Sequence, residues 1–416
     1  MLEGAILKSS VELITEIIEN KKKPKLEIKK YFKKNRFAGS KDKRLIQEIV
    51  FKYLKNYFSL EKICRKNQIK LNFRNTLLVY YFSENRKKNL KDIYEGKYSI
   101  KPEIEDEKIY KIAINLTHKI IPSLPNWLEK KIGKNINLKA SYQSVLLEPR
   151  FDLRVNNLNS RDDVIKLLSK NNIPSVESKF SQLGITILKR IEEKKINKIK
   201  SGAFEIQDEG SQIVTILSGA KSGEKVLDYC AGKGTKTIAL YEQMQGIGSL
   251  YVYDENQQRL TYLNRRLERL KLNKKIFLFD HDDKFKNYFD LVLLDVPCTG
   301  SGVWRRRPES IIKINKANLK EYVRTQKEIL NKASKYCKKN GIMSYITCSL
   351  FEDENEGQVK SFLKENKGFE ILDINLMLKE KFNKNIIKNT NSWLTLNLSE
   401  INSDGFFICL LKKKYE

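Results

Sequence analysis

The sequence is poor in the residues that build metal sites and histidine-based catalytic sites. It contains two histidines, His118 and His281, and six cysteines whose spacing forms no close pair. Zinc sites need clustered cysteine and histidine ligands, and a catalytic triad needs a histidine, so neither site is expected and no metal cofactor is predicted. Unpaired cysteines are typical of a reducing compartment, which predicts a cytoplasmic protein.

Long apolar runs are missing as well. No stretch approaches the ~20 apolar residues that span a bilayer. The opening residues, MLEGAILKSS, lack the basic and apolar segments of a signal peptide. No membrane partner is therefore expected.

Positive charge, by contrast, is abundant. The 416 residues include 80 lysines and arginines against 51 acidic residues, a net charge of +29. This exceeds what solubility requires, and nucleic acid is the partner that fits best, because binding phosphates releases their counterions. The alternative is a lysine-rich genome bias with no partner. The length predicts two or three domains, and a hydrophobic content of 40% is enough to build their cores.

Residues 1–122 are predicted to form an all-α domain. Apolar residues fall at helical spacing in one stretch, with Asp42 placed to cap its start. The residues of this stripe are Leu45, Ile46, Ile49, Val50, Tyr53, Leu54 and Tyr57. Two prolines, Pro122 and Pro125, mark the predicted end of the domain.

Residues 123–200 are predicted to form a small α+β connecting subdomain. An apolar strand pattern near residue 151 precedes the helical segment RDDVIKLLSK. Ser160 and Asp163 have the spacing of a capping box for that helix.

Residues 201–416 have the alternating pattern of an α/β domain. Short apolar runs alternate with helical segments such as ENQQRLTYLNRRLERL, and the runs are KVLDYC, GSLYVYD, KIFLFD, FDLVLLDVPC and GIMSYITCS. This pattern predicts a Rossmann-like parallel sheet wound with helices. Ligands of such sheets bind beyond the carboxyl ends of the strands, where these runs carry polar or reactive residues.

The glycine-rich turn VLDYCAGKGTKT predicts an S-adenosylmethionine (SAM) site. A phosphate-binding loop is excluded because Cys230 and Thr235 stand at its two glycine positions, and the dinucleotide fingerprint lacks its third glycine. The SAM pattern D-x-[GC]-x-G-x-G is matched at all four of its positions, by Asp228, Cys230, Gly232 and Gly234.

Acidic residues at the ends of the next strands extend the predicted cofactor site. Asp254 stands where a carboxylate binds ribose hydroxyls in related folds, and Asp280 could hold the adenine amino group, with Asp282 as its neighbouring alternative. The competing interpretation of each is a helix cap.

Cys298 and Cys348 are the candidate reactive residues. Each ends a predicted central strand, in DVPCTGSG and in YITCSLFEDENE. An acid-rich helix start is expected behind Cys348, and the dipole of that helix would lower the pKa of its thiol. The remaining cysteines Cys64, Cys337 and Cys409 are interpreted as buried apolar residues.

A basic stretch follows the first of these loops. In WRRRPE, Trp304 could stack on a base, while Arg305, Arg306 and Arg307 could bind phosphates. The alternative is that these arginines pair with acidic residues of the domain itself.

The chain resembles the RsmB/NSUN family of RNA 5-methylcytosine methyltransferases, most closely its bacterial RsmB branch. The resemblance covers nearly the whole chain, and the pairing of a Pro-Cys loop with a later Thr-Cys-Ser loop is highly specific. Its motifs are DYCAGKGTKT, DVPCTGSGVWRRRPE, YITCSLFEDENE, QDEGSQ, LRVNNLNSRDDVI and DGFFICLLKK. The helical region resembles the NusB-like RNA-binding domain that precedes the catalytic domain in bacterial members.

The resemblance implies a catalytic mechanism and a set of site residues. Cys348 would add to carbon 6 of cytosine, Cys298 would assist product release, and Asp295 would bind the polar edge of the base. Lys236 is implied as a further contact near base and cofactor. The implied SAM contacts are Cys230, Ala231, Gly232, Lys233, Gly234, Thr235, Lys236, Asp254, Asp280 and Asp295.

Three departures from the family pattern stand in these motifs. The loop after Cys230 reads AGKGTK instead of Ala-Pro-Gly-Gly-Lys, Val296 replaces an alanine, and Gly210 stands where alanine is common. None removes a reacting group, so an active monomeric enzyme with a changed SAM affinity is expected.

Ribosomal RNA is the expected substrate, and three alternatives remain open. They are the same chemistry on transfer RNA, a DNA cytosine methyltransferase that uses the Pro-Cys thiol as its nucleophile, and a non-catalytic RNA-binding assembly factor.

Overall fold

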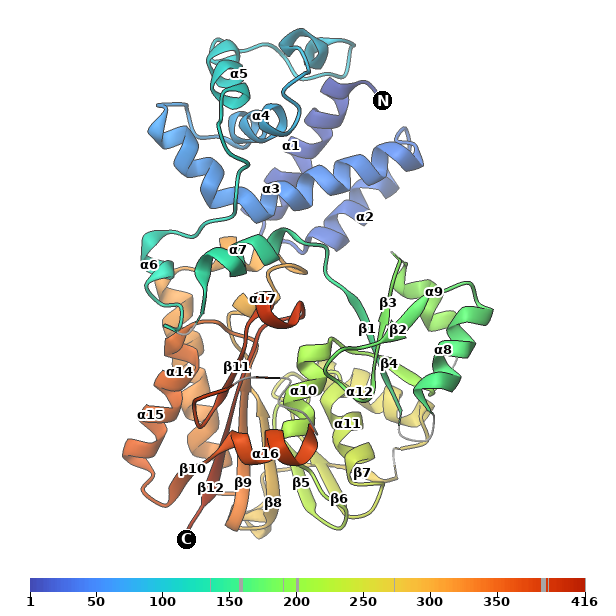
Figure 1. Ribbon diagram of the computed structural model, residues 1–416, viewed down its shortest axis with the longest axis vertical. Coiled ribbons are helices and arrows are strands. Elements are labelled where there is room, and N and C mark those ends of the chain that lie inside the picture. Colours follow the sequence, from blue (N-terminus) through green and yellow to red (C-terminus); the bar gives the residue numbers. More distant parts are fainter. Residues whose placement is uncertain are drawn as a thin grey trace. The chain divides into compact units, whose positions relative to one another are not determined.

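The computed structural model describes residues 1–134, 136–156, 160–189, 191–199, 202–272, 274–382, 387 and 389–415. It divides into two compact units (Figure 1). The helical unit comprises residues 1–148 and 304–315, and the α/β unit comprises residues 149–303 and 316–415.

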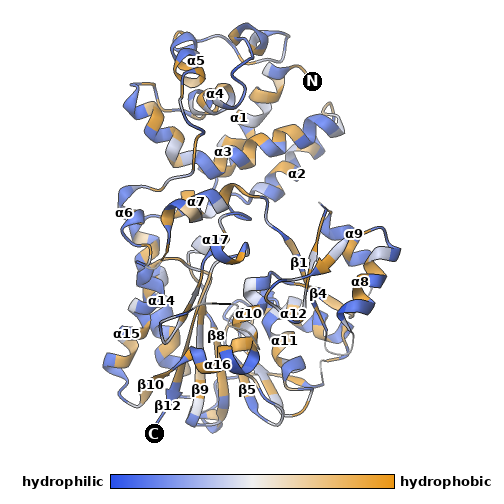
Figure 2. Ribbon diagram, viewed as in Figure 1, coloured by the Kyte–Doolittle hydropathy of each residue, from blue (hydrophilic) through white to orange (hydrophobic). Residues whose placement is uncertain are grey.

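The helical unit is built from amphipathic helices around one apolar core. Its elements are α1 (Glu3–Glu19), α2 (Pro24–Lys34), α3 (Ser40–Lys66), α4 (Phe73–Glu84), η1 (Leu90–Tyr94), α5 (Asp106–Ile114), α6 (Asn126–Glu129), α7 (Leu138–Leu146) and α13 (Glu309–Lys313). Hydrophobic and hydrophilic residues alternate in bands along helices such as α3 (Figure 2). The all-α prediction for this region is confirmed, while its NusB-like character remains an interpretation.

Helix α3 shows how the sequence pattern produces this packing. Ile46, Val50 and Tyr53 are buried at helical spacing, as predicted, whereas Leu45 is 44% exposed. The Asp42 carboxylate accepts a hydrogen bond from the backbone N–H of Gly39 at 3.1 Å, so it caps the helix from its first turn.

The unit boundaries differ from the predicted ones. Helices α6 and α7 cluster with the helical unit, and a later segment, 304–315, rejoins it. Pro122 and Pro125 therefore lie inside this unit and not at its end. A long-range insertion of this kind leaves no local sequence signal.

A small antiparallel sheet opens the α/β unit. Its strands pair in the order β2–β3–β1–β4. The elements are β1 (Phe151–Val155), α8 (Arg161–Lys170), β2 (Ser175–Glu177), β3 (Gly184–Ile187), α9 (Glu193–Lys198) and β4 (Phe204–Ile206). Ser160 caps α8, since its hydroxyl accepts from the backbone N–H of Asp163 at 3.1 Å.

Four parts of the predicted connector fall outside the described residues. They are residue 135, residues 157–159 of the LRVNNLNSRDDVI motif, residue 190 and residue 200, and residue 201 at the predicted boundary lies outside them as well.

The main sheet has eight strands in the described part of the chain. Seven pair in the order β10–β12–β9–β8–β5–β6–β7, and β11 adds to β12. The strands are β5 (Lys225–Asp228), β6 (Ser249–Val252), β7 (Ile276–Leu278), β8 (Phe289–Asp295), β9 (Cys337–Thr347), β10 (Phe369–Leu372), β11 (Leu394–Leu396) and β12 (Phe406–Lys413). The five runs predicted as parallel strands are β5 to β9, which pair in parallel. Strand β12 is antiparallel to β9 and β10.

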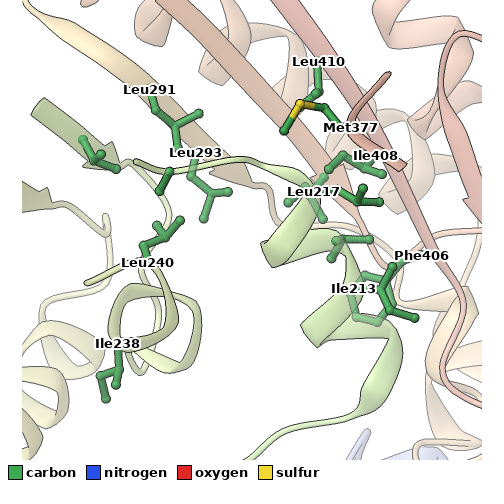
Figure 3. Packing of buried hydrophobic residues seen from close by; sticks show 14 of the residues in the cluster. Ile213, Leu217, Ile238, Leu240, Leu291, Leu293, Met377, Phe406, Ile408 and Leu410 are labelled. Carbon is green, nitrogen blue, oxygen red and sulfur yellow. The ribbon is translucent and has the colours of Figure 1, made fainter. Parts of the chain in front are cut away.

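Helices cover both faces of this sheet. They are α10 (Glu209–Leu217), α11 (Thr235–Gln243), α12 (Gln257–Arg269), α14 (Lys316–Ala333), α15 (Glu356–Glu365), α16 (Ile374–Lys381) and α17 (Leu398–Ile401), with short turns η2 (Asp283–Phe285), η3 (Ser301–Val303) and η4 (Glu352–Glu354). Leu291 and Leu293 of β8 pack with α10, α11 and α16 on one face (Figure 3), whereas Val292 and Leu294 pack with α14 and α15 on the other. Strands buried on both faces explain the unbroken apolar runs in the sequence.

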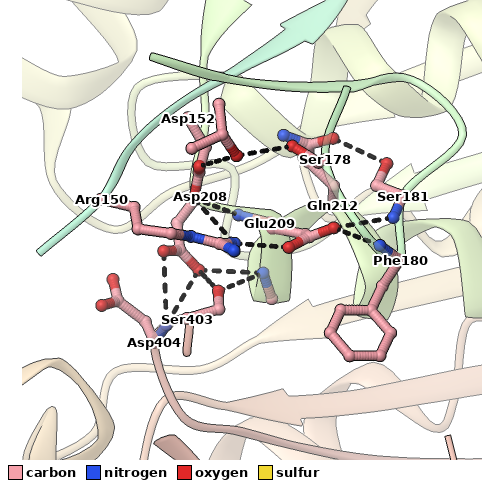
Figure 4. A network of polar contacts seen from close by, with 12 residues as sticks. Arg150, Asp152, Ser178, Phe180, Ser181, Asp208, Glu209, Gln212, Ser403 and Asp404 are labelled. Carbon is pink, nitrogen blue, oxygen red and sulfur yellow. Dashed lines mark hydrogen bonds and ion pairs between the residues drawn. The ribbon is translucent and has the colours of Figure 1, made fainter. Parts of the chain in front are cut away.

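The QDEGSQ motif joins the small sheet to the main one (Figure 4). The buried Glu209 carboxylate forms an ion pair with Arg150 and accepts from the backbone N–H of Ser181 at 2.9 Å. Asp208 accepts from the hydroxyl of Ser403 at 2.6 Å. A Cβ on Gly210 would meet the carbonyl oxygen of Asp404 at 2.7 Å, so glycine is required where the family pattern has alanine.

No helix among the described residues is long and apolar enough to cross a membrane.

Candidate active site

The two candidate cysteines meet at the carboxyl ends of neighbouring parallel strands. Cys298 follows β8 and Cys348 follows β9, and their Sγ atoms lie 3.4 Å apart. Both residues are half-buried and neither is in a disulfide. Fifty residues of chain separate them, so only the sheet topology brings them together. By contrast, Cys64, Cys337 and Cys409 are buried, as predicted.

The Cys298 thiol is held in its protonated form. Contact with the Cys348 sulfur raises the pKa of Cys298 well above its ordinary value, and burial and the nearby Glu354 charge raise it further. A thiol with a raised pKa holds its proton more tightly and is less available as a thiolate nucleophile.

The predicted helix start behind Cys348 is displaced along the chain. The turn η4 begins at Glu352, and α15 begins at Glu356. Cys348 therefore does not directly precede a helix of several turns. A dense set of hydrogen bonds, described below, orders this loop instead.

Lys236 and Asp295 form an ion pair at the same edge of the sheet. The Lys236 Nζ lies 2.7 Å from Asp295 Oδ2 and 5.3 Å from the centre of the Phe406 ring. Lys236 is 9% exposed and comes from the first turn of α11, while Asp295 ends β8 three residues before Cys298. Because the lysine is held by two partners, it is placed with little freedom beside the Asp295 carboxylate.

The glycine turn between β5 and α11 has the shape of a ligand cradle. Gly232 and Gly234 have φ angles of +56° and +81°, which side chains rarely adopt. A Cβ on Gly232 would meet no atom closer than 4.0 Å, so the space above this backbone is open. The Asp254 carboxylate supports the turn by accepting from the backbone N–H of Gly232 at 2.9 Å.

Asp228 contributes a buried carboxylate to the same turn. Its Oδ2 accepts a hydrogen bond from the Thr237 hydroxyl at 2.7 Å, while its Oδ1 has no hydrogen-bond partner among the described residues. Burial raises the pKa of Asp228 to about 7. A buried acceptor without a partner, next to an open glycine backbone, fits a ligand that brings its own donor.

The three strand-end acids differ in their surroundings. The Asp254 oxygens accept from the backbone N–H groups of Gly232 and Asn256, and each retains a further lone pair for a ligand. The Asp280 side chain is 63% exposed, beside Lys284. Asp282 caps η2, so the capping interpretation holds for it.

The structure corrects the interpretation of the WRRRPE stretch as an RNA contact. Trp304 and Arg305 are 2% and 1% exposed, so neither presents a surface on which RNA could stack or bind. Arg305 lies close enough to Lys55 that burial and the arginine charge together lower the pKa of Lys55 to about 8. Arg306 is half-buried with partners of its own, and Arg307 is exposed beside Glu309. Burial of a Trp-Arg pair has no local sequence signal.

Three residues important for the site were not identified from the sequence. Glu354, Gln326 and Thr237 have buried polar side chains that bind the site's loops and carboxylates. Glu354 lies within YITCSLFEDENE, where its charge was interpreted as part of a helix start. In the described ranges, no group of three or more histidine, cysteine or acidic residues is arranged to hold a metal ion.

The sheet and its glycine turn give the α/β unit the Rossmann-like fold of SAM-dependent methyltransferases. Residues 214–412 match the family model described as 16S rRNA methyltransferase RsmB/F. This match confirms the resemblance to the RsmB/NSUN family that the motifs indicated.

Known proteins similar to this chain agree with that match. The ribosomal RNA small subunit methyltransferase B of Photorhabdus laumondii is 29% identical over 299 residues, which span 70% of this chain but just under two thirds (66%) of that relative. The crystal structure of PH0851 covers 98% of this chain and 99% of its own with a TM-score of 0.71 at 21% identity, which shows a shared fold. NSun6 from Pyrococcus horikoshii, solved with SFG, covers 70% of this chain and 99% of its own with a TM-score of 0.57 at 20% identity.

Proposed function

We propose that this protein transfers a methyl group from SAM to carbon 5 of a cytosine in RNA, with small-subunit ribosomal RNA as the substrate. The RsmB/F family description and the name of the Photorhabdus relative support ribosomal RNA methylation. The SAM analogue SFG in the NSun6 structure supports SAM as the methyl donor.

The observation that carries this proposal is the 3.4 Å contact between Cys298 and Cys348. Carbon 5 of cytosine is a poor nucleophile, and addition of a thiolate to carbon 6 makes it electron-rich enough to accept a methyl group. Afterwards the carbon 5 proton must leave and the sulfur–carbon 6 bond must break. Two thiols in contact match a reaction that needs one group to attack carbon 6 and a second group to assist release of the product.

Cys348 is the proposed nucleophile, and Cys298 is proposed to assist product release. The resemblance of the YITCSLFEDENE and DVPCTGSG loops to the motifs of the RsmB/NSUN family supports this division of roles. The Asp295 carboxylate, beside Lys236, is proposed to bind the polar edge of the cytosine and favour the charge state that accepts the thiolate.

The glycine turn is proposed to hold SAM, which supplies the methyl group. This assignment is supported by the open backbone at Gly232 and by the Asp228 Oδ1, which has no hydrogen-bond partner within the described ranges. Asp254 is proposed to bind the ribose hydroxyls with its remaining lone pairs, and Asp280 the adenine amino group.

A basic segment of the helical unit, residues 21–44, is proposed to bind the RNA backbone. It contains twelve lysines and arginines and two acidic residues, Glu27 and Asp42. All twelve basic side chains are exposed except the half-buried Lys43. Such a density of surface charge supports binding to phosphates, where each contact releases counterions. This role agrees with the NusB-like interpretation of the unit.

The test compares wild type, Cys348→Ala and Cys298→Ala with SAM and ribosomal RNA lacking the modification. Methyl incorporation and a denaturant-stable protein–RNA adduct are measured on the same gel. We expect methylation by wild type, neither signal from Cys348→Ala, and an accumulated adduct from Cys298→Ala. Transfer RNA in a parallel reaction checks the substrate class.

Other results would contradict specific parts of the proposal. An adduct that disappears only with Cys298→Ala would reverse the two thiol roles, as in a DNA-type mechanism. RNA binding by all three proteins with neither methylation nor adduct would favour an assembly factor. Methylation of transfer RNA alone would overturn the ribosomal substrate.

A further inference from the structure

A buried carboxylate, Glu354, connects the two cysteine loops. It is fully buried and accepts hydrogen bonds from four donors among the described residues. Its Oε1 accepts from the backbone N–H of Thr299 at 2.9 Å, and its Oε2 accepts from the Thr299 hydroxyl at 2.5 Å and from the Ser349 hydroxyl. Thr299 directly follows Cys298, and Ser349 directly follows Cys348.

Gln326 of α14 extends this connection to the other side of Cys298. Its Nε2 group donates to Glu354 Oε1 at 2.9 Å and to the carbonyl oxygen of Pro297 at 3.0 Å. The residues on both sides of Cys298 are therefore bound to the carboxylate or to its glutamine partner. Burying the Glu354 carboxylate away from water is costly. Its four hydrogen bonds offset that cost only when both cysteine loops and Gln326 hold their donors in place.

We propose that Glu354 is a positioning residue that holds Cys298 and Cys348 side by side by binding the residue after each. It acts through the two loops and not by touching substrate or cofactor. The catalytic meaning of this role rests on the proposed function, whereas the thiol geometry itself does not.

Glu354 also contributes charge to the site. Burial raises the pKa of Glu354, although its hydrogen bonds oppose that rise. Cys348 and Glu354 both raise the pKa of Cys298, and the backbone N–H of Gly300 lowers it. Geometry and charge can be separated, because glutamine can accept the bonds to Oε1 and donate to the two hydroxyls, while alanine can do neither.

The test uses Glu354→Ala and Glu354→Gln, with Glu356→Ala as the matched control. Glu356 lies two residues away, is half-buried, and has no hydrogen bond to either cysteine loop among the described contacts. The first readout is capture of phenylarsine oxide, in which two neighbouring thiols bond to one arsenic atom and its oxygen leaves as water. The Cys298→Ser variant lacks one thiol of the pair, so the phenylarsine oxide that it still captures is bound elsewhere on the protein.

We expect Glu354→Ala to lose capture by the pair and to lower kcat about 100-fold with little change in the KM for SAM, because displacement of a reacting group by about 1 Å costs this much. Glu354→Gln should restore capture and most of kcat. It should also lower the pH at which Cys298 alkylates in a Cys348→Ala background, because a negative charge is removed. A purely structural role would not shift that pH.

Several outcomes would overturn the proposal. One is a result in which Glu354→Ala and the Glu356→Ala control differ by no more than about twofold in arsenic capture and in kcat. A difference of that size is too small for a displaced reacting group. Another is a Glu354→Gln variant that loses as much arsenic capture and kcat as Glu354→Ala does. If Glu354→Ala fails to fold, Glu354→Asp replaces it, because the shorter side chain cannot reach both loops, and unchanged capture in that variant would contradict the proposal.

The readouts also separate this proposal from the proposed function. Should capture respond as expected while wild type methylates no RNA, the positioning role stands and the methyltransferase proposal fails.

Discussion

The basic segment of the helical unit and the candidate site of the α/β unit use charged residues in opposite ways. In the helical unit, the basic segment 21–44 presents its lysines and arginines on the surface of the protein. In the α/β unit, the important charges are buried: Asp228 at the glycine turn, Glu354 between the cysteine loops, and Lys236 paired with Asp295. The effect of surface charges depends on how many there are, so any single one can be replaced. The effect of a buried charge depends on its position, so it cannot be replaced in this way.

This difference has a physical cause. An exposed lysine is screened by water and salt, so its contribution to binding a polyanion is small and adds to that of its neighbours. A buried carboxylate must find its donors within the fold, and moving one donor leaves an unpaired group. Substitutions in the two units should therefore differ in both size and specificity.

The largest effect is expected for Gly302→Ala in the α/β unit. Gly302 N–H donates to the carbonyl oxygen of Cys348 at 2.8 Å, and an added Cβ would meet the carbonyl oxygen of Gly405 at 2.2 Å. We expect the free energy of unfolding to fall by about 1–3 kcal/mol. Methylation should fall by about 100-fold, because the Cys348 loop must shift. Urea unfolding and methyl incorporation measure the two effects.

Gly39→Ala in the helical unit is the matched control for that substitution. The nearest atom to a Cβ there is the flexible carboxylate of Asp42 at 3.3 Å. We expect a loss of less than about 1 kcal/mol and unchanged methylation. Equal effects of the two alanines would contradict the contrast between the units.

A smaller effect, one that depends on pH, is expected for Asp228→Asn. The pKa of Asp228 is raised from 3.8 to about 7 by burial, so between these values the folded protein binds more protons than the unfolded chain. The wild-type free energy of unfolding should therefore fall as the pH rises toward 7, by up to about 1.4 kcal/mol per unit, and the variant should lose this slope. Urea unfolding at pH 5 to 8 without SAM measures it.

The exposed Asp282 provides the control for this experiment. Hydrogen bonds from Lys284 lower the pKa of Asp282, so this carboxyl does not titrate between pH 5 and 8. Asp282→Asn should leave the wild-type slope intact. Parallel curves for wild type and Asp228→Asn would show that burial does not raise the pKa of Asp228.

The smallest effect per residue is expected on the basic segment. Replacing Lys25, Lys29 and Lys33 of α2 together by alanine should weaken RNA binding about tenfold at 0.15 M salt and reduce the salt slope by about 2 to 3, with each single substitution contributing a fraction. Filter binding over a range of salt concentrations measures both. The melting temperature should not change, because all three side chains are exposed.

An equal number of lysines elsewhere in the helical unit serves as the control. Lys97, Lys101 and Lys108 are also exposed, but they lie among acidic residues in the segment 95–111. Their joint replacement should leave the salt slope nearly unchanged. A similar loss from both triple variants would mean that net charge, and not the segment 21–44, governs binding.

Much of the fold could be predicted from local patterns. The five strands β5 to β9, the α3 helix and the Ser160 cap are all encoded within a few residues of where they form. The glycine turn and the two cysteine loops could be identified because their irregular backbone requires glycine and proline at fixed positions. The domain boundaries could not, because residues 304–315 return to the helical unit through long-range contacts.

The prediction for WRRRPE was wrong for Trp304 and Arg305 for a similar reason. Tryptophan and arginine next to a reactive loop have the composition of an RNA contact, but burial depends on what the rest of the chain packs around them. In this structure both side chains lie inside the protein, and Arg305 acts on the buried Lys55.

The sequence by itself determined the order of strands and helices, the glycine turn, the two cysteines and the surplus of positive charge. These depend on periodicity, turn chemistry and composition, which act over short distances along the chain. Only the tertiary structure decided that Cys298 and Cys348 touch and that Glu354 binds the residue after each. It also decided that Asp228 keeps an oxygen with no hydrogen-bond partner in the described part of the chain. Each of these arrangements depends on strands that pair across tens of residues, and a buried polar group acquires its partners only when that pairing is complete.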